Sequence, residues 1–361
     1  MNKKIQSTAA ALALIMLLSG CSGNTSPSLS ETTPDTTAAS TSESQEDTTA
    51  ATSESSEASE DTTVESKEEG ASASQNTEPV DVNRDISEYI LSDNDTALEM
   101  AEKIDKKYRV DVIFGDDIRT VFDADGDNLH AEKYTNEEGI KTALKSVDEA
   151  LGVFPQGLTE QLSQSSKGIL KIYLTGAIGK GDAKPEPGQY PAFTDDKDPE
   201  LYLTIDVSLD GVINIPTVAH ELTHVIDFRL HDLGLMDEDE WNKLNPEGFK
   251  YTENYDSYRN CEYTDKYSYC SEHYSPRTLS QPDNDVYFYY NYSFVNAYED
   301  RATLMENLVI YRMWNYEVAP GLYKFEHVKA KASYLLDKIS QAFQLNEQDV
   351  ASWKKSFEEI S

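Results

Sequence analysis

Apolar residues recur three or four positions apart in the segment that follows residue 95, and this is the period of one face of an α-helix. Ala97, Met100 and Ile104 lie on that face. Asp95 can cap the start of the helix, which we expect to reach about Lys107. The same period predicts further helices over residues 136–151 (capped by Thr135), 215–230, 298–314, 321–343 and 347–360.

Three short segments have the alternation, or the β-branched and aromatic residues, of strands. They are residues 109–114, residues 169–175 (Ile-Leu-Lys-Ile-Tyr-Leu-Thr) and residues 201–207 (Leu-Tyr-Leu-Thr-Ile-Asp-Val). Residues 176–200 are rich in Gly, Pro, Lys and Asp, which predicts a long loop. After Trp241 we expect mostly irregular chain to about residue 287. Strands and helices thus come first and a helical half follows, which is the order of an α+β fold.

Composition changes abruptly along the chain. Residues 22–84 consist mainly of Ser, Thr, Glu, Asp and Ala, so they cannot bury enough apolar surface to offset the entropy of ordering them. We expect a disordered tether there and one folded domain over residues 85–361. Its roughly 275 residues suffice for one large or two small hydrophobic cores. An α+β half should extend to about residue 230, and a mainly helical half should follow.

The formal net charge of −35 exceeds what the tether supplies, so the folded domain is acidic too. Nucleic-acid phosphates and anionic lipid headgroups are bound by Lys and Arg, so this charge argues against nucleic acid as a partner and against electrostatic docking on a membrane. Net charge speaks mainly to solubility, and it gives only a slight preference for a basic or neutral substrate.

The first 21 residues have the pattern of an export signal. Lys3 and Lys4 make a basic start, and residues 9–18 form an apolar run that is too short for a membrane-spanning helix. The run ends in Leu-Ser-Gly-Cys21, which resembles the lipobox of bacterial lipoproteins. The resemblance implies cleavage before Cys21, acylation of Cys21 by chains such as palmitate, and a lipid anchor on the extracytoplasmic face of a bacterial cell membrane.

Two further cysteines, Cys261 and Cys270, lie in a polar, Tyr-rich stretch. Outside the cytosol a disulfide between them is the simplest interpretation, and it would pin a surface loop. The alternative is a metal site formed by the two thiols with His273 as a third donor.

The strongest chemical signal is His220-Glu221-Leu-Thr-His224, inside the helix predicted at 215–230. Residues four apart share a helix face, so His220 and His224 can present two imidazoles to one metal ion. Glu221 can reach the same space and act as a base. The alternative is a buried core helix whose two histidines only form hydrogen bonds with their neighbours.

Two histidines are not enough, because a catalytic zinc normally takes three protein ligands and keeps a fourth position for water. The longer form of the motif would place a third His at position 230, but that residue is Leu230, and His231 is one place too late. The third ligand must therefore come from elsewhere. Glu299, in the helix predicted at 298–314, is the best candidate. Glu306, seven residues on and on the same face, competes with it.

These two short motifs resemble the gluzincin metallopeptidases, and within them the anthrax lethal factor and Pro-Pro endopeptidase group. In that group an Asp follows the second His, where this chain has Asp227 after His224. The ligand Glu opens a Glu-x-x-Ala stretch, as Glu299 does, and a Tyr seven residues before it faces the site, where this chain has Tyr292. The resemblance covers these motifs and the lipoprotein signal.

The resemblance implies a zincin-like α+β fold with a small mixed sheet. It implies one zinc ion per chain, held by His220, His224 and Glu299. Glu221 would take a proton from the zinc-activated water and later deliver it to the leaving amine, and Tyr292 would donate to the developing oxyanion. Asp227 and Asp300 are candidates to orient a His ligand.

We therefore expect a surface-anchored, zinc-dependent endopeptidase that hydrolyses a peptide or protein substrate and acts as a monomer. A strand ahead of the motif helix, at 169–175 or 201–207, can bind an extended peptide at its edge. A non-catalytic surface lipoprotein that keeps the fold as a binding module is the alternative. A glycan-processing metal hydrolase is a third possibility, which only the many tyrosines support.

Overall fold

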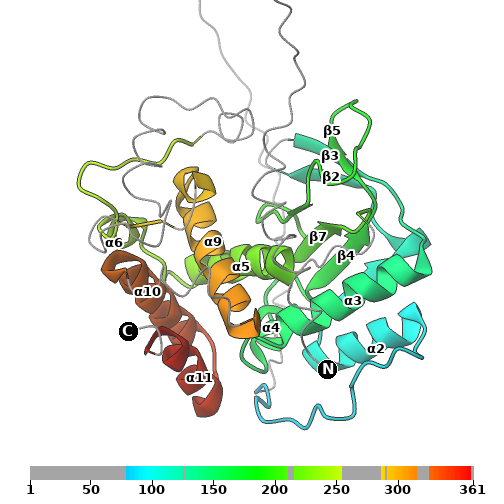
Figure 1. The fold of residues 1–361 in the computed structure, drawn as a ribbon, viewed down its shortest axis with the longest axis horizontal. Helices are drawn as coiled ribbons and strands as arrows, with labels where there is room; N and C mark the ends of the chain where they lie inside the picture. Colours follow the sequence, from blue (N-terminus) through cyan, green and yellow to red (C-terminus); the bar gives the residue numbers. More distant parts are fainter. Residues whose placement is uncertain are drawn as a thin grey trace, which may run out of the picture. The chain divides into compact units, whose positions relative to one another are not determined.

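A four-stranded mixed sheet organises the first half of the folded chain (Figure 1). The computed structural model describes residues 79–124, 127–209, 215–253, 286–288, 291–314 and 325–358. The sheet order is β1-β4-β7-β6, with the first three strands parallel and β6 antiparallel to β7. These strands are β1 (Asp111–Phe114), β4 (Lys171–Thr175), β7 (Tyr202–Asp206) and β6 (Ala192–Phe193).

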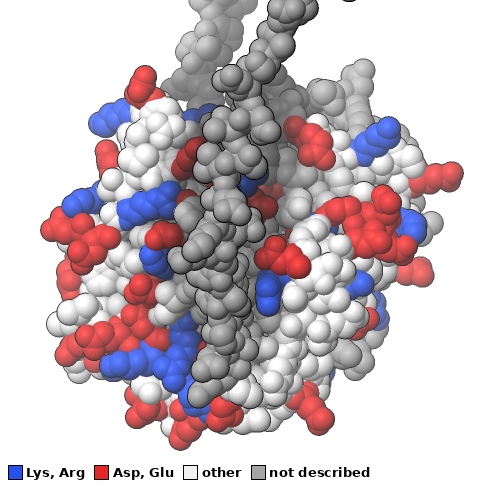
Figure 2. Space-filling model, turned by 180° about the vertical axis from the view of Figure 1, so that it is seen from behind, with Lys and Arg blue, Asp and Glu red and all other residues white. Residues whose placement is uncertain are grey.

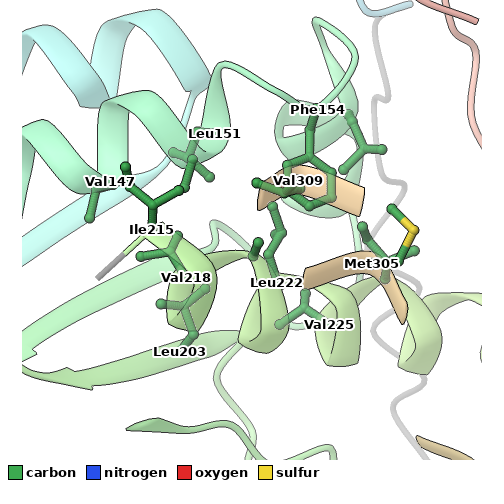
Figure 3. Packing of buried hydrophobic residues seen from close by; sticks show 14 of the residues in the cluster. Val147, Leu151, Phe154, Leu203, Ile215, Val218, Leu222, Val225, Met305 and Val309 are labelled. Carbon is green, nitrogen blue, oxygen red and sulfur yellow. The ribbon is translucent and has the colours of Figure 1, made fainter. Parts of the chain in front are cut away.

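Successive side chains of β4 and β7 point to opposite faces of this sheet. Ile172 and Leu203 belong to the main hydrophobic core, whereas Tyr173 and Tyr202 belong to a second cluster on the other face. Figure 3 shows Leu203 next to Val218 of the motif helix. The helices whose residues share the main core with the sheet are α2 (Ala97–Tyr108), α3 (Glu137–Leu151) and α5 (Ile215–Asp232).

A three-stranded antiparallel sheet, in the order β2-β3-β5, packs against the tyrosine face of the first sheet. The ring of Phe122 lies 5.8 Å from that of Tyr173 and 5.3 Å from that of Tyr202. The prediction of a continuous loop over 176–200 is wrong, because this range contains β5 and β6. Strands of two or three residues depend on pairing with distant strands, which local composition does not reveal. The second sheet consists of β2 (Val121–Ala124), β3 (Asp127–Ala131) and β5 (Ile178–Lys180).

The described residues from 291 onward are mainly helical, as predicted. α9 (Ala297–Trp314) packs against α5, and Figure 3 shows its Met305 and Val309 beside Leu222 and Val225 of α5. With α3 and β7 on its other sides, α5 is enclosed, which explains why every residue from Val218 to Asp227 is buried. The described residues thus form an α+β fold, and this fold class is confirmed. The other α-helices among the described residues are α4 (Leu158–Leu162), α6 (Glu238–Asn242), α10 (Glu326–Ala342) and α11 (Glu347–Glu358).

Two helices start one residue later than expected. Thr96 caps α2 in place of Asp95: its hydroxyl accepts from the backbone N–H of Glu99, and the Glu99 carboxylate accepts from the N–H of Thr96. Asp95 is instead held in a salt bridge of 2.6 Å. Asn136 caps α3 in place of Thr135. In both helices the side-chain oxygen of the capping residue accepts from the third backbone N–H of the helix. The sequence alone does not show which of two adjacent polar residues will cap the helix.

The folded structure includes a few residues that the sequence composition places in the predicted tether. Val80 and Val82 are both buried, and their side chains lie 3.0 Å from where a Cβ of Gly157 would stand. Gly157 also has a φ of +81°, so both the conformation and the close approach require glycine there. The N-terminal segment at Val80 therefore packs against the α4 region.

Several predictions concern residues outside the described ranges. The signal segment with Cys21, the tether up to residue 78, and the pair Cys261 and Cys270 are among them. The lipid anchor and the disulfide therefore stay predictions. Among the described residues, no helix is both long and apolar enough to cross a membrane.

Acidic side chains are spread over the face seen in Figure 2, with Lys and Arg between them. Many charges of the described chain form short pairs, such as Lys145 with Asp93 at 2.6 Å and Lys133 with Asp116 at 2.9 Å. Ion pairs this exposed are screened by solvent and add little to stability. They do not by themselves indicate a site.

Candidate metal centre

Helix α5 presents its two histidines on one side and its apolar residues on the others. Val218, Leu222 and Val225 fill the core between α5, the sheet and α9. His220 and His224, four residues apart, lie on the same face, and each is only 9% exposed. The ring of His224 stacks on that of Phe228 one turn on, at 6.4 Å and 17°. The helix therefore holds both imidazoles in a shielded position.

Three donor atoms from two helices converge at this face. Nε2 of His220 lies 3.0 Å from Oε2 of Glu299 and 3.2 Å from Nε2 of His224, and the third side of this triangle measures 3.5 Å. Ligands at the usual bond lengths from a tetrahedral zinc ion stand about 3.3 Å apart. The three residues thus form a buried group that could bind a metal ion.

The position of Glu299 follows from the start of α9. The side-chain oxygen of Asn296 accepts from the backbone N–H of Glu299 at 2.9 Å, which fixes the first turn of the helix. Tyr292, in the 3₁₀ turn Asn291–Phe294 just before α9, donates its hydroxyl to Oε1 of Glu299 at 3.1 Å. One carboxylate oxygen is therefore held by Tyr292 while the other faces the two imidazoles.

Glu306 also reaches the centre, but from a different side. Its Oε2 lies 3.2 Å from Nδ1 of His220, whereas Glu299 faces Nε2 of the same ring. Of the two carboxylates proposed as third ligand, Glu299 is the one that joins the group with His220 and His224.

The charges of the centre favour a cation. Burial is the largest influence on Glu221 and raises the pKa of its carboxyl, while the two neighbouring imidazoles partly oppose this. Burial also works to raise the pKa of Glu299, but His224 and His220 outweigh it and hold that pKa low. Burial works to lower the pKa of His220, yet its bonds with Glu299 and Glu306 raise it well above the ordinary value. Three carboxylates thus surround two imidazoles in a small buried volume.

Asp227 and Asp300, which the sequence suggested as partners of a His ligand, are engaged elsewhere. Asp227 accepts from Nε of Arg301 at 2.6 Å, and Asp300 accepts from Nζ of Lys331 at 2.7 Å and from the hydroxyl of Tyr251 at 2.8 Å. Within the described part of the chain, no hydrogen bond links either aspartate with His220 or His224. They bind the helices together behind the centre instead.

The buried ion pairs of Asp227 with Arg301 and of Asp300 with Lys331 were not predicted from the sequence. Arg301 is fully buried and also binds Glu238 of α6 at 2.7 Å. Its guanidinium and the ammonium of Lys331 both lie over the ring of Trp241, at 5.3 Å and 5.7 Å. The available signal was a Lys or Arg at a core-facing position of an amphipathic helix, which indicates a buried partner of opposite charge.

Comparisons of the chain with protein-family models, with curated proteins and with solved structures found no match. The functional assignment therefore depends on the motif and on the geometry of these residues.

Proposed function

We propose that this chain is a zinc-dependent endopeptidase of the gluzincin type, exported and anchored by a lipid at Cys21. One observation carries the proposal: His220, His224 and Glu299 form a buried triangle of donors with sides of 3.0–3.5 Å, and Glu221 lies beside it on α5. The zincin-like fold belongs to the same proposal. A mixed sheet that packs against the motif helix, and a Glu supplied by α9, support it.

Zinc suits this donor set better than other common ions. Two imidazole nitrogens and one carboxylate oxygen at tetrahedral spacing are typical of catalytic zinc, whereas calcium and magnesium prefer six or more oxygen ligands. When bound, a zinc ion with three protein ligands would lower the pKa of a water molecule in its fourth position and polarise a substrate carbonyl.

Glu221 would act as the general base in this mechanism. Burial raises the pKa of its carboxyl, which makes the carboxylate a better proton acceptor at neutral pH. It would take a proton from the attacking water and deliver it to the amine that leaves when the peptide bond breaks.

Tyr292 has two roles in the proposed mechanism. Its hydroxyl holds Oε1 of Glu299, and its ring lies 5.8 Å from that of His220. A phenol at this place can donate to the oxygen of the scissile carbonyl as negative charge develops there, if it exchanges its bond with Glu299 for that oxygen.

A substrate would be bound as an extended peptide. The two strands suggested from sequence cannot take this role, because β4 and β7 are both paired on each side within the sheet. β6 is one of the two edge strands of this sheet, with β1 at the opposite edge; it pairs with β7 and contacts α5. Edge pairing along β6 would align a peptide with the metal centre.

The test is a peptide-library cleavage screen on the exported chain, with and without a chelator. Cleavage that disappears with chelator and returns with zinc supports the proposal. Stoichiometric zinc without any cleavage would favour the non-catalytic binding protein. Mass spectrometry of the N-terminal tryptic fragment tests acylation of Cys21, and alkylation with and without reductant tests the Cys261–Cys270 disulfide.

A further inference from the structure

Glu306 lies on the side of the His220 ring that faces away from the metal group. Its Oε2 is 3.2 Å from Nδ1, whereas Nε2 faces Glu299 at 3.0 Å and His224 at 3.2 Å. A neutral imidazole has one N–H and one lone pair. If Nδ1–H donates to a carboxylate, the lone pair is on Nε2, which is the atom that a metal ion needs.

The spacing of Glu299 and Glu306 along α9 explains how one histidine contacts two carboxylates. Glu299 and Glu306 are seven residues apart, which is about two turns and about 10 Å of helix rise, so they lie on one face of α9. α9 packs against α5 at this level. Glu299 therefore reaches Nε2 of His220, and Glu306 reaches Nδ1 of the same ring.

We propose that Glu306 is a positioning residue, which holds His220 in the tautomer and rotation that turn Nε2 toward the metal group. The inference rests on the proposed metal-dependent function. Asp227 and Asp300 pair with the buried cations Arg301 and Lys331, and among the described residues neither is hydrogen-bonded to His220. The side chain of Glu306 is only 17% exposed, so little water competes for the hydrogen bond.

Zinc affinity and the hydrogen bond of the His220 Nδ1–H test this role. The full chain carrying Glu306→Ala or Glu306→Gln is compared with wild type by chelator competition. We expect Glu306→Ala to weaken zinc binding about tenfold to a hundredfold and still bind one ion at saturation. Glu306→Gln should weaken zinc binding less, because its amide oxygen can accept a hydrogen bond from Nδ1–H. The matched control is Asp148→Ala, which removes a carboxylate that is 19% exposed and binds Lys107. This variant should bind zinc with wild-type affinity.

A second readout separates positioning from a merely structural role. NMR of ¹⁵N-histidine-labelled, zinc-loaded chain reports whether the Nδ1–H of His220 is hydrogen-bonded. Wild type and Glu306→Gln should show an Nδ1–H that exchanges slowly with water, and Glu306→Ala should show a fast-exchanging or lost Nδ1–H signal. Circular dichroism confirms that each variant is folded.

Three results would contradict the inference. Wild-type affinity and an unchanged His220 signal in Glu306→Ala would leave Glu306 without the positioning role. Loss of all zinc in Glu306→Ala, together with full zinc in Glu299→Ala, would make Glu306 the third ligand instead. A wild-type chain that binds no zinc would overturn the proposed function as well, so the two failures are distinguishable.

Discussion

Nε2 of His220 and Oε2 of Glu299 lie 3.0 Å apart, although 79 residues separate them in the chain. The distance is close to the roughly 3.3 Å expected between two ligands of a tetrahedral zinc ion. Both side chains are buried and are held by other contacts, His220 by Glu306 and Glu299 by Tyr292. The two helices therefore bring the donors to metal-binding spacing through their packing.

Replacing either of these residues should abolish stoichiometric metal. His220→Ala or Glu299→Ala leaves two donors, which is too few for a stable zinc site. Elemental analysis after gel filtration should give one zinc per chain for wild type and a small fraction for both variants. His231→Ala, which alters a 28% exposed histidine on the same helix outside the group, should keep full zinc. Full zinc in Glu299→Ala would disprove this set of ligands.

Replacing Glu221 with Gln should separate binding from catalysis. The amide keeps the size of the side chain but cannot take a proton, so zinc content should stay at one per chain. The rate of peptide cleavage should fall by at least about 10²-fold, the usual contribution of a general base. Wild-type cleavage by Glu221→Gln would assign the proton transfer to another group.

The parts of the centre that depend on local spacing could be predicted from the sequence. His220, Glu221 and His224 lie within two helical turns, so their common face follows from helix geometry alone. Glu299 was identified by the periodicity of its helix and by a family resemblance. Spacing could not separate it from Glu306, because both lie on one face of α9. Only the packing of α9 against α5 shows that they face different nitrogens of His220.

Features made by distant pairs could not be predicted. The ion pair of Asp227 with Arg301 joins residues 74 apart, and that of Asp300 with Lys331 joins residues 31 apart. Nothing in the local pattern around Asp227 indicates an arginine partner, and its position after His224 suggested a role toward the metal. β5 was missed for the same reason, since its three residues form a strand only by pairing with β3.

Replacing Tyr292 with Phe should slow catalysis without releasing the metal. The change removes the hydroxyl that donates to Glu299 and that would donate to the oxyanion. We expect kcat to fall about 10²-fold to 10³-fold, the usual cost of one oxyanion donor, with KM and zinc content little changed. Tyr298→Phe, one residue before Glu299, is the matched control. An unchanged kcat in Tyr292→Phe would end its proposed transition-state role.

Replacing Lys331 with Met should destabilise the fold. Lys331 and Asp300 have side chains that are 1% and 3% exposed, so the change leaves an unpaired carboxylate in the core. The expected loss is about 3–5 kcal/mol in the free energy of unfolding, measured by urea denaturation. Adding Asp300→Leu should restore part of that loss. Lys338→Met, two turns further along α10, should cost much less. Equal losses from Lys331→Met and Lys338→Met would contradict the buried-pair argument.

Asp105 should make stability depend on pH. Burial raises the pKa of its carboxyl from 3.8 to about 6, although its oxygen accepts from the backbone N–H of Val112 at 2.8 Å. Between about pH 4 and pH 6 the folded chain binds more protons at this site than the unfolded chain does. The contribution of Asp105 to stability is therefore present at low pH and is lost as the pH rises through 6.

Asp105→Asn isolates this contribution, because the amide oxygen can still accept from Val112 but does not ionise. We expect the variant to match wild type near pH 4 and to exceed it by about 1 kcal/mol at pH 7, after allowance for solvent screening of a partly exposed group. Urea denaturation from pH 4 to pH 7.5 measures the difference. Asp116→Asn, whose side chain is 89% exposed, should give no such trend. A difference that is constant with pH would show that Asp105 ionises as easily in the folded chain as in the unfolded one.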